Sequence, residues 1–296
     1  MEETTRWLVG LDLLPENTGV FRITSWLRAR EPEAQAIGVH VVETGLFRFL
    51  GERVPTILEG ARERVGEAVS EAGGGVELFA KLEAVAASTA ERGLMDAALR
   101  HGARALVIGR WSRRGQRSVV KLGRVARRIL RALPVPVIVT PPDLLRSDIG
   151  GGPILLVTDL SETSTAAARF AVDLAERSAR PLVVAYVGVP RSHAALYVLD
   201  AEMEALIEQE RREVEARAHA WVEANVAGDP DVKVAFGEIE TELLELAEEL
   251  SASMIVCGSR GLSVTERIFA SSTASNLAGL ARCPVAVVPA GEKDQA

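Results

Sequence analysis

The chain has 296 residues, 48% of them hydrophobic, which is enough for about two globular domains of roughly 150 residues with a core each. Its net charge of −7 divides into +4 for residues 1–148 (22 basic, 18 acidic) and −11 for residues 149–296 (12 basic, 23 acidic), so the overall sign identifies no class of partner. No apolar run reaches the ~18 residues of a membrane-spanning helix, and no membrane association is expected.

The start of the chain gives an expectation about its compartment. The first six residues are polar and partly acidic, unlike the basic and then apolar start of a secretory signal. We therefore expect a cytoplasmic protein, whose two cysteines, Cys257 and Cys283, stay reduced and lie buried in the core.

In the first half, short apolar runs alternate with stretches of helical periodicity. The runs predict strands near residues 8–12, 36–42, 76–81, 106–109 and 137–140. Strands that alternate with helices are typical of a parallel sheet.

The segment of residues 110–131 holds nine basic side chains and no acidic one. They are Arg110, Arg113, Arg114, Arg117, Lys121, Arg124, Arg127, Arg128 and Arg131. We favour a solvated face, or contact with the acidic second half, because a basic run alone specifies no partner. A small anionic ligand is an alternative. Nucleic acid is not expected, since Trp111 is the only aromatic residue among the basic ones.

The second half follows a stretch rich in proline and glycine, residues 141–153. Its apolar runs predict strands at residues 154–159, 182–187, 232–236, 254–258 and 285–289. They are apolar almost throughout, as strands covered by helices on both faces are. A charged helix is predicted over about residues 200–225, with Leu206, Val214 and Trp221 facing inward.

Three runs of the first half recur in the second at a nearly constant distance. Residues 8–12 correspond to 155–159, 105–109 to 254–258, and 136–139 to 284–287, with offsets of 147, 149 and 148. The repeat predicts an α/β protein with two tandem Rossmann-like, doubly wound domains, residues 1–148 and 149–296.

Each domain is expected to have its own five-stranded parallel sheet flanked by helices, so one continuous sheet would contradict the duplication. The final strand of each half is short and apolar, and pairing these two strands would close both edges in an internal pseudo-dimer.

A ligand crevice is predicted in the second half. In an open parallel sheet, ligands bind beyond the carboxyl ends of the strands, where the strand order reverses. Asp159 and Gly258 end the first and fourth strands of this half, so both should face one crevice. Glycine lets the backbone turn tightly there, and the amides of the helix that starts near Ser272 can receive phosphate.

This pattern resembles the universal stress protein family. The pattern in this sequence begins with a strand-terminal Asp and Gly-x-x-Gly from Gly258. Nine residues later comes a pair of small residues before a helix, and the final strand begins with Cys-Pro-Val. The resemblance covers nearly all of residues 154–290 and, more loosely, residues 6–141.

The resemblance implies a site for ATP or a related adenine nucleotide, with Mg²⁺ as a companion ion, in the second half. Its residues would be Asp159, Val187, Gly258, Gly261, Ser271 and Ser272. Asp159 and the backbone of Val187 would contact adenine and ribose, and the other positions lie toward the phosphates. Ser271 stands where ATP-binding members have glycine, which leaves both ATP binding and its absence open.

The first half departs further from the family pattern. Gly109 is present, but Ser112 replaces the second glycine, ten residues instead of nine lead to Gly123, and Arg124 replaces the hydroxyl residue. A bulky cation there could fill the phosphate position, so we expect no ATP in this half.

The sequence indicates binding rather than catalysis. It has no Gly-x-Ser-x-Gly motif and no P-loop, and its four histidines lack metal-binding spacing, so neither catalytic nor metal-binding residues are expected. The resemblance implies a non-enzymatic stress-response factor with protein partners that the sequence does not identify, and it leaves further dimerisation open. A ligand-independent interaction protein and a slow ATP hydrolase using Asp159 are the alternatives.

Overall fold

The structure, a computed structural model, describes residues 4–12, 18–46, 53–71, 75–110, 122–142, 144, 149, 151–188, 200–259 and 273–291. Within these residues the strands are β1 (Arg6–Gly10), β2 (Gln35–Glu43), β3 (Lys81–Ala87), β4 (Ala105–Gly109), β5 (Val137–Thr140), β6 (Ile154–Val157), β7 (Leu182–Gly188), β8 (Asp231–Phe236), β9 (Met254–Gly258) and β10 (Val285–Val288). The α-helices are α1 (Thr18–Arg30), α2 (Val54–Glu71), α3 (Ala90–Arg100), α4 (Arg124–Ala132), α5 (Thr165–Ser178), α6 (Asp200–Asn225), α7 (Ile239–Glu249) and α8 (Thr273–Leu280).

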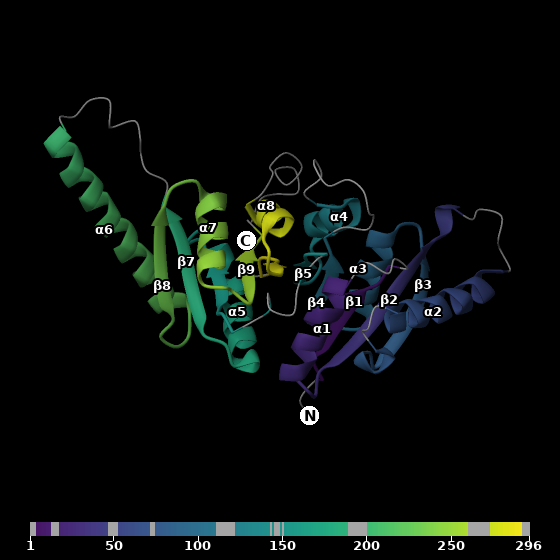
Figure 1. Cartoon of the computed structure of the whole chain (residues 1–296). Helices are drawn as coiled ribbons and strands as arrows, with labels where there is room; N and C mark the ends of the chain where they lie inside the picture. The colour runs from purple at the N-terminus through teal and green to yellow at the C-terminus, as the bar shows by residue number, and fades with distance from the viewer. Residues whose placement is uncertain are drawn as a thin grey trace.

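The strands form one ten-stranded sheet in the order β3-β2-β1-β4-β5-β10-β9-β6-β7-β8. Each half contributes five neighbouring parallel strands, and the second half repeats the order of the first in reverse across the sheet (Figure 1). The strand order reverses between β1 and β4 in the first half and between β6 and β9 in the second. The predicted α/β fold with two tandem parallel units is confirmed.

The expectation of two separate sheets is wrong, because β5 and β10 pair antiparallel and join the two halves. Ile138 pairs with its equivalent Ala286, and on either side Val139 pairs with Val285 and Val137 with Val287, so the pairing is reciprocal about a local twofold axis. Both strands are buried and, apart from Thr140 at the end of β5, apolar, and an apolar edge left open would invite association. The continuous sheet thus follows from the edge closure and leaves the duplication intact.

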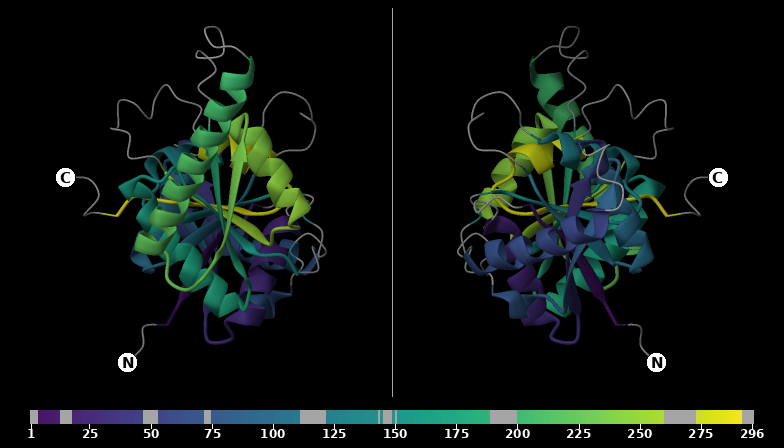
Figure 2. Two further views of the ribbon diagram at one scale, coloured as in Figure 1. Left: turned by 90° about the vertical axis from the view of Figure 1, so that its left-hand side faces the viewer. Right: turned by 90° about the vertical axis from the view of Figure 1, so that its right-hand side faces the viewer.

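Two layers of helices cover the sheet. The core on one face contains side chains of α1, α2 and α5 and the end of α6, and the core on the other contains side chains of α3, α4, α7 and α8. The end-on view in Figure 2 shows α6 and α7 on opposite sides of β8. Among the described residues, no helix has both the length and the apolar character that a membrane span requires.

Most strands lie within two residues of their predicted bounds, and the third strand is the exception. The apolar run at residues 76–81 is not a strand: Val76–Leu78 form a 3₁₀ turn, and β3 follows it. The run is apolar because Leu78 and Phe79 enter the core, where Phe79 meets Phe21 edge-on. β3 was missed because it is an edge strand with polar positions, Lys81 and Glu83 among them.

A second contact joins the halves, away from the paired strands. Arg104 lies between the Trp7 and Phe170 rings, 4.9 and 5.4 Å from their centroids. Its guanidinium donates to Glu31 of the first half (2.9 Å) and to Asp173 of the second. Burial raises the pKa of Glu31, although the positive charges of Arg104 and Arg177 oppose that shift.

Candidate functional site

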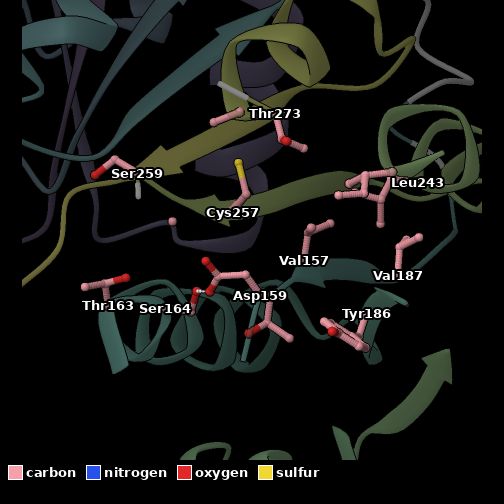
Figure 3. Close-up of a pocket in the computed structure, with 14 residues that line it drawn as sticks. Val157, Asp159, Thr163, Ser164, Tyr186, Val187, Leu243, Cys257, Ser259 and Thr273 are labelled. Atoms are coloured by element: carbon pink, nitrogen blue, oxygen red, sulfur yellow. Dashed lines mark hydrogen bonds between the residues drawn. The ribbon is translucent and has the colours of Figure 1, made fainter. Parts of the chain in front are cut away.

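The carboxyl ends of β6 and β9 form the base of a cavity in the second half. Val157 pairs with Cys257 in the last shared row of these strands, and Gly258, the next residue, and Asp159, the second residue after Val157, follow on the same edge of the sheet. Asp159, Val187 and Gly258 all line this cavity of about 260 Å³ (Figure 3). The expected convergence of Asp159 and Gly258 at the strand-order reversal is therefore present.

Hydroxyl groups hold the Asp159 carboxylate at the mouth of the cavity. Its Oδ1 accepts hydrogen bonds from the Ser161 amide (3.1 Å), the Ser161 hydroxyl (2.5 Å) and the Ser164 hydroxyl (2.8 Å). Ser164 is buried, and Thr163 bonds to Ser161 through its own hydroxyl at 2.8 Å. The carboxylate is thus fixed by local donors that orient it, while Asp159 itself is exposed.

The next strand contributes backbone groups to the same space. Thr158 donates to the carbonyl of Ala185 at 3.1 Å, and Gly237 donates to the carbonyl of Gly188 at 3.4 Å. Because alternate residues of a parallel strand present their N–H and C=O to the same neighbour, Val187 presents its pair on the side of β6. β6 ends at Val157, so these groups of Val187 lie beyond the end of β6, where the cavity lies.

Apolar side chains and one thiol complete the described walls. Val157 and Cys257 come from the two central strands, Leu243 from α7, and Ala274 from α8. Burial raises the pKa of the Cys257 thiol to about 12, so while it is buried the thiol is protonated at neutral pH and unreactive. The walls are suited to a flat apolar group with polar edges.

Three of the six predicted site residues lie outside the described chain. These are Gly261, Ser271 and Ser272. The next residue, Thr273, begins α8 and lines the cavity. Gly258 has no positive φ, and a Cβ there would meet its nearest protein atom at 3.6 Å, an ordinary contact. A tight turn is therefore not what requires glycine at position 258.

Sequence reasoning missed the hydroxyl cluster and Tyr186. The cluster had a local signal, since an Asp followed by Ser at the second and fifth positions is typical of a turn in which side chains bond to nearby backbone. Tyr186 had none, because a tyrosine in a strand is ordinary. It is half-buried and lines the cavity beside Val187.

The corresponding mouth of the first half is spanned by ion pairs. Arg124, the first residue of α4, lies 3.6 Å from Glu43 at the end of β2, and Arg128 pairs with Glu91 in the first turn of α3. His40 occupies the strand position of Tyr186, and its Nδ1 lies 2.9 Å from the carbonyl of Leu11.

The described residues of the basic segment contact both halves. Arg124 and Arg128 meet acidic residues of their own half, not of the acidic second half. Arg110 does reach the second half, but it bonds to backbone carbonyls there. Arg113, Arg114, Arg117 and Lys121 lie outside the described residues, as does Ser112.

Comparison with known proteins covers both halves. The model of the universal stress protein family matches the chain twice, over residues 4–141 and 152–289. Among solved structures, a universal stress protein from Archaeoglobus fulgidus is similar over 98% of this chain and 100% of its own, with a TM-score of 0.69 and 17% identity. A protein of unknown function from Pseudomonas aeruginosa is similar over 97% of this chain and 93% of its own, with a TM-score of 0.65 and 14% identity. No curated protein sequence matches the chain.

Proposed function

The chain belongs to the universal stress protein family, with two copies of its domain, and on that premise we propose that its second half binds an adenine nucleotide, ATP first among them, as a non-enzymatic stress-response factor. The observation that carries the proposal is that Asp159, Val187 and Gly258 line one cavity at the strand-order reversal. Ligand occupancy would then alter a surface that a protein partner contacts.

The chemistry of the described walls supports a nucleoside. Val187 can offer one backbone donor and one acceptor to the edge of a base, and the apolar walls from Val157 and Leu243 can contact its faces. The fixed carboxylate of Asp159 can accept hydrogen bonds from ribose hydroxyls. A cavity of about 260 Å³ is below the roughly 300–1,000 Å³ of pockets for drug-sized ligands, so the phosphates would lie outside these walls.

Binding rather than catalysis is the proposed role. Cys257 is protonated at neutral pH, and Asp159 is the one carboxylate among the described lining residues. Across the described chain, no three His, Cys, Asp or Glu side chains gather as a metal site. The described residues therefore do not form a Mg²⁺ site by themselves, and the proposal includes no step that depends on Mg²⁺.

Isothermal titration with ATP tests the proposal with a matched pair of variants. Asp159→Asn should weaken binding by roughly tenfold or more, because a hydrogen bond to a charged group contributes about 1.5–3 kcal/mol. Asp12→Asn changes the equivalent residue of the first half and should leave the affinity unchanged.

Three outcomes would contradict parts of the proposal. Absence of ATP binding by the wild-type protein would favour the ligand-independent interaction protein. Loss of ATP binding in Asp12→Asn but not in Asp159→Asn would show that the site lies in the first half. Phosphate release by the wild-type protein that disappears in Asp159→Asn would indicate a hydrolase.

A further inference from the structure

Arg110 of the first half bonds to the end of a helix in the second. Its Nη1 donates to the carbonyl of Gly279 at 2.8 Å, and its Nη2 donates to the carbonyl of Ala281. These carbonyls belong to the last turn of α8 and the residue after it. The last four carbonyls of a helix have no partner within the helix, and a cation at this end is favourable. Arg110 therefore stabilises α8 where it ends.

The other end of α8 lines the nucleotide cavity. Thr273 and Ala274 are in the cavity wall, and the helix of eight residues is about 12 Å long. Leu277 and Ala278 are buried in the same core as Cys257, whose sulfur points toward the start of α8 in Figure 3. Because so short a helix moves as one body, a contact at its last turn positions its first turn.

Among the described residues, this contact runs from the first half to the second. Arg110 and Ser259 hold equivalent positions, since each follows the fourth strand of its half and donates its amide to the fifth at 2.8 Å, to Thr140 and Val288 respectively. Ser259 lines the cavity of its own half, and its side chain has a single carbon. The long side chain at this position thus occurs only in the first half, where it crosses to the half with the cavity.

From this geometry we propose that Arg110 is a positioning residue through which the first half sets the shape of the ligand site in the second half. The inference rests on the proposed function of that site and adds a role for the first half, which is to hold α8 against the cavity. Arg110 follows Gly109 at the carboxyl end of β4, beside the ion pairs of the first half. A residue from this end of the first half therefore holds the helix that lines the cavity of the second half.

The first test needs no ligand. In a Cys283→Ser background, the rate at which N-ethylmaleimide labels Cys257 reports how often the cavity opens under α8. Arg110→Gln should raise this rate about tenfold, within the range known for coupling between sites. Arg110→Lys keeps the charge but not the two-armed donor, and should give an intermediate rate.

The matched control is Arg127→Gln. Arg127 also donates from its guanidinium to a backbone carbonyl, that of Leu122 at 3.1 Å, but within its own half. It should leave the labelling rate of Cys257 unchanged. Equal labelling rates in wild type, Arg110→Gln and Arg127→Gln would overturn the inference.

ATP titration of the same variants supplies the second test. Arg110→Gln should weaken ATP binding several-fold relative to Arg127→Gln, measured under conditions where urea unfolding shows both variants to be fully folded. Faster labelling with unchanged affinity would overturn the link between α8 and the ligand. Absence of ATP binding in the wild type would contradict the proposed function, whereas the role of Arg110 would still be decided by the labelling rates.

Discussion

The two mouths of the sheet have the same strands and different side chains. In the first half, Arg124 and Arg128 connect α4 to Glu43 and Glu91. In the second, the equivalent of Arg128 is Asn276, whose amide donates to Glu240 at 3.1 Å, and a cavity lies at the strand ends. We infer that duplication preserved the scaffold, while a few residues at the strand ends decide what each copy can bind.

Two contacts, which we call the seam, join the halves into one structural unit: the β5–β10 pair and the Arg104 contact. The β5–β10 pair makes a single sheet, and the Arg104 contact joins Glu31 to Asp173 on the face covered by α1 and α5. The halves therefore should unfold together. A copy that binds nothing can still contribute stability and position to its neighbour.

The largest expected effect comes from the seam. Arg104→Ala should lower the free energy of unfolding by about 3 kcal/mol, because it leaves the buried Glu31 carboxylate without its main partner. Urea unfolding should show one transition at a lower midpoint. Hydrogen exchange should be faster in both β1 and β6, and an effect confined to β1 would contradict joint unfolding.

An exposed ion pair of the first half provides the control for Arg104. Arg92 and Asp96 lie 3.7 Å apart on α3, with side chains 70% and 66% exposed. Solvent screens such a pair, so Arg92→Ala should change stability by no more than about 0.5 kcal/mol. Equal effects of the two variants would show that burial of the seam contact does not matter.

A smaller effect is expected at the mouth of the second half. Ser164→Ala removes the buried hydroxyl that bonds to Asp159 and should weaken ATP binding about fivefold, since a hydrogen bond contributes about 1 kcal/mol. Ser178→Ala removes a buried hydroxyl at the other end of α5, one that bonds to the carbonyl of Leu174 at 2.6 Å. Ser178→Ala should lower the stability of the protein and leave its ATP affinity unchanged. Equal losses of ATP affinity in the two variants would show that the bond from Ser164 to Asp159 has no specific role in ATP binding.

The sequence predicted the fold of both halves because the signals are local and repeated. The apolar strands and the offsets near 148 residues gave the parallel units, and the need to close two apolar edges gave the β5–β10 pair. Edge strand β3 was missed since Lys81 and Glu83 interrupt its apolar residues and the apolar run at residues 76–81 directly precedes it. The expectation of two separate sheets was wrong, because pairing β5 with β10 closes both edges and thereby joins the two sheets into one.

The site was predictable only in part. Asp159 and Gly258 could be placed at one mouth because strand ends and strand order are topological features. The partners of Arg110 and Arg124 could not, since side chains that cross between elements depend on angles and distances that no spacing encodes. The charge count left a solvated face and contact with the acidic half open, and in the structure Arg124 and Arg128 are partly exposed and pair with carboxylates on β2 and α3 of their own half.

The smallest expected effect concerns the ion pair of the first mouth and appears as a dependence on pH. Burial acts to raise the pKa of Glu91, but the hydrogen bond and charge of Arg128, with the donors of Glu91 and Thr89, outweigh it and hold the pKa below 4.5. The unfolded chain therefore takes up this proton first as the pH falls, so the contribution of Glu91 is complete above about pH 5 and is lost below it.

Arg128→Asn copies the residue of the second half and should raise this pKa toward its ordinary value. The variant should be less stable than the wild type by up to about 1 kcal/mol at pH 7, and the gap should narrow as the pH falls from 5 to 3. Urea midpoints across this range measure it. Arg131→Asn, an exposed change in the same helix, should keep a constant difference from the wild type. A gap for Arg128→Asn that stays constant would show that the pair across the first mouth contributes no stability through the Glu91 charge.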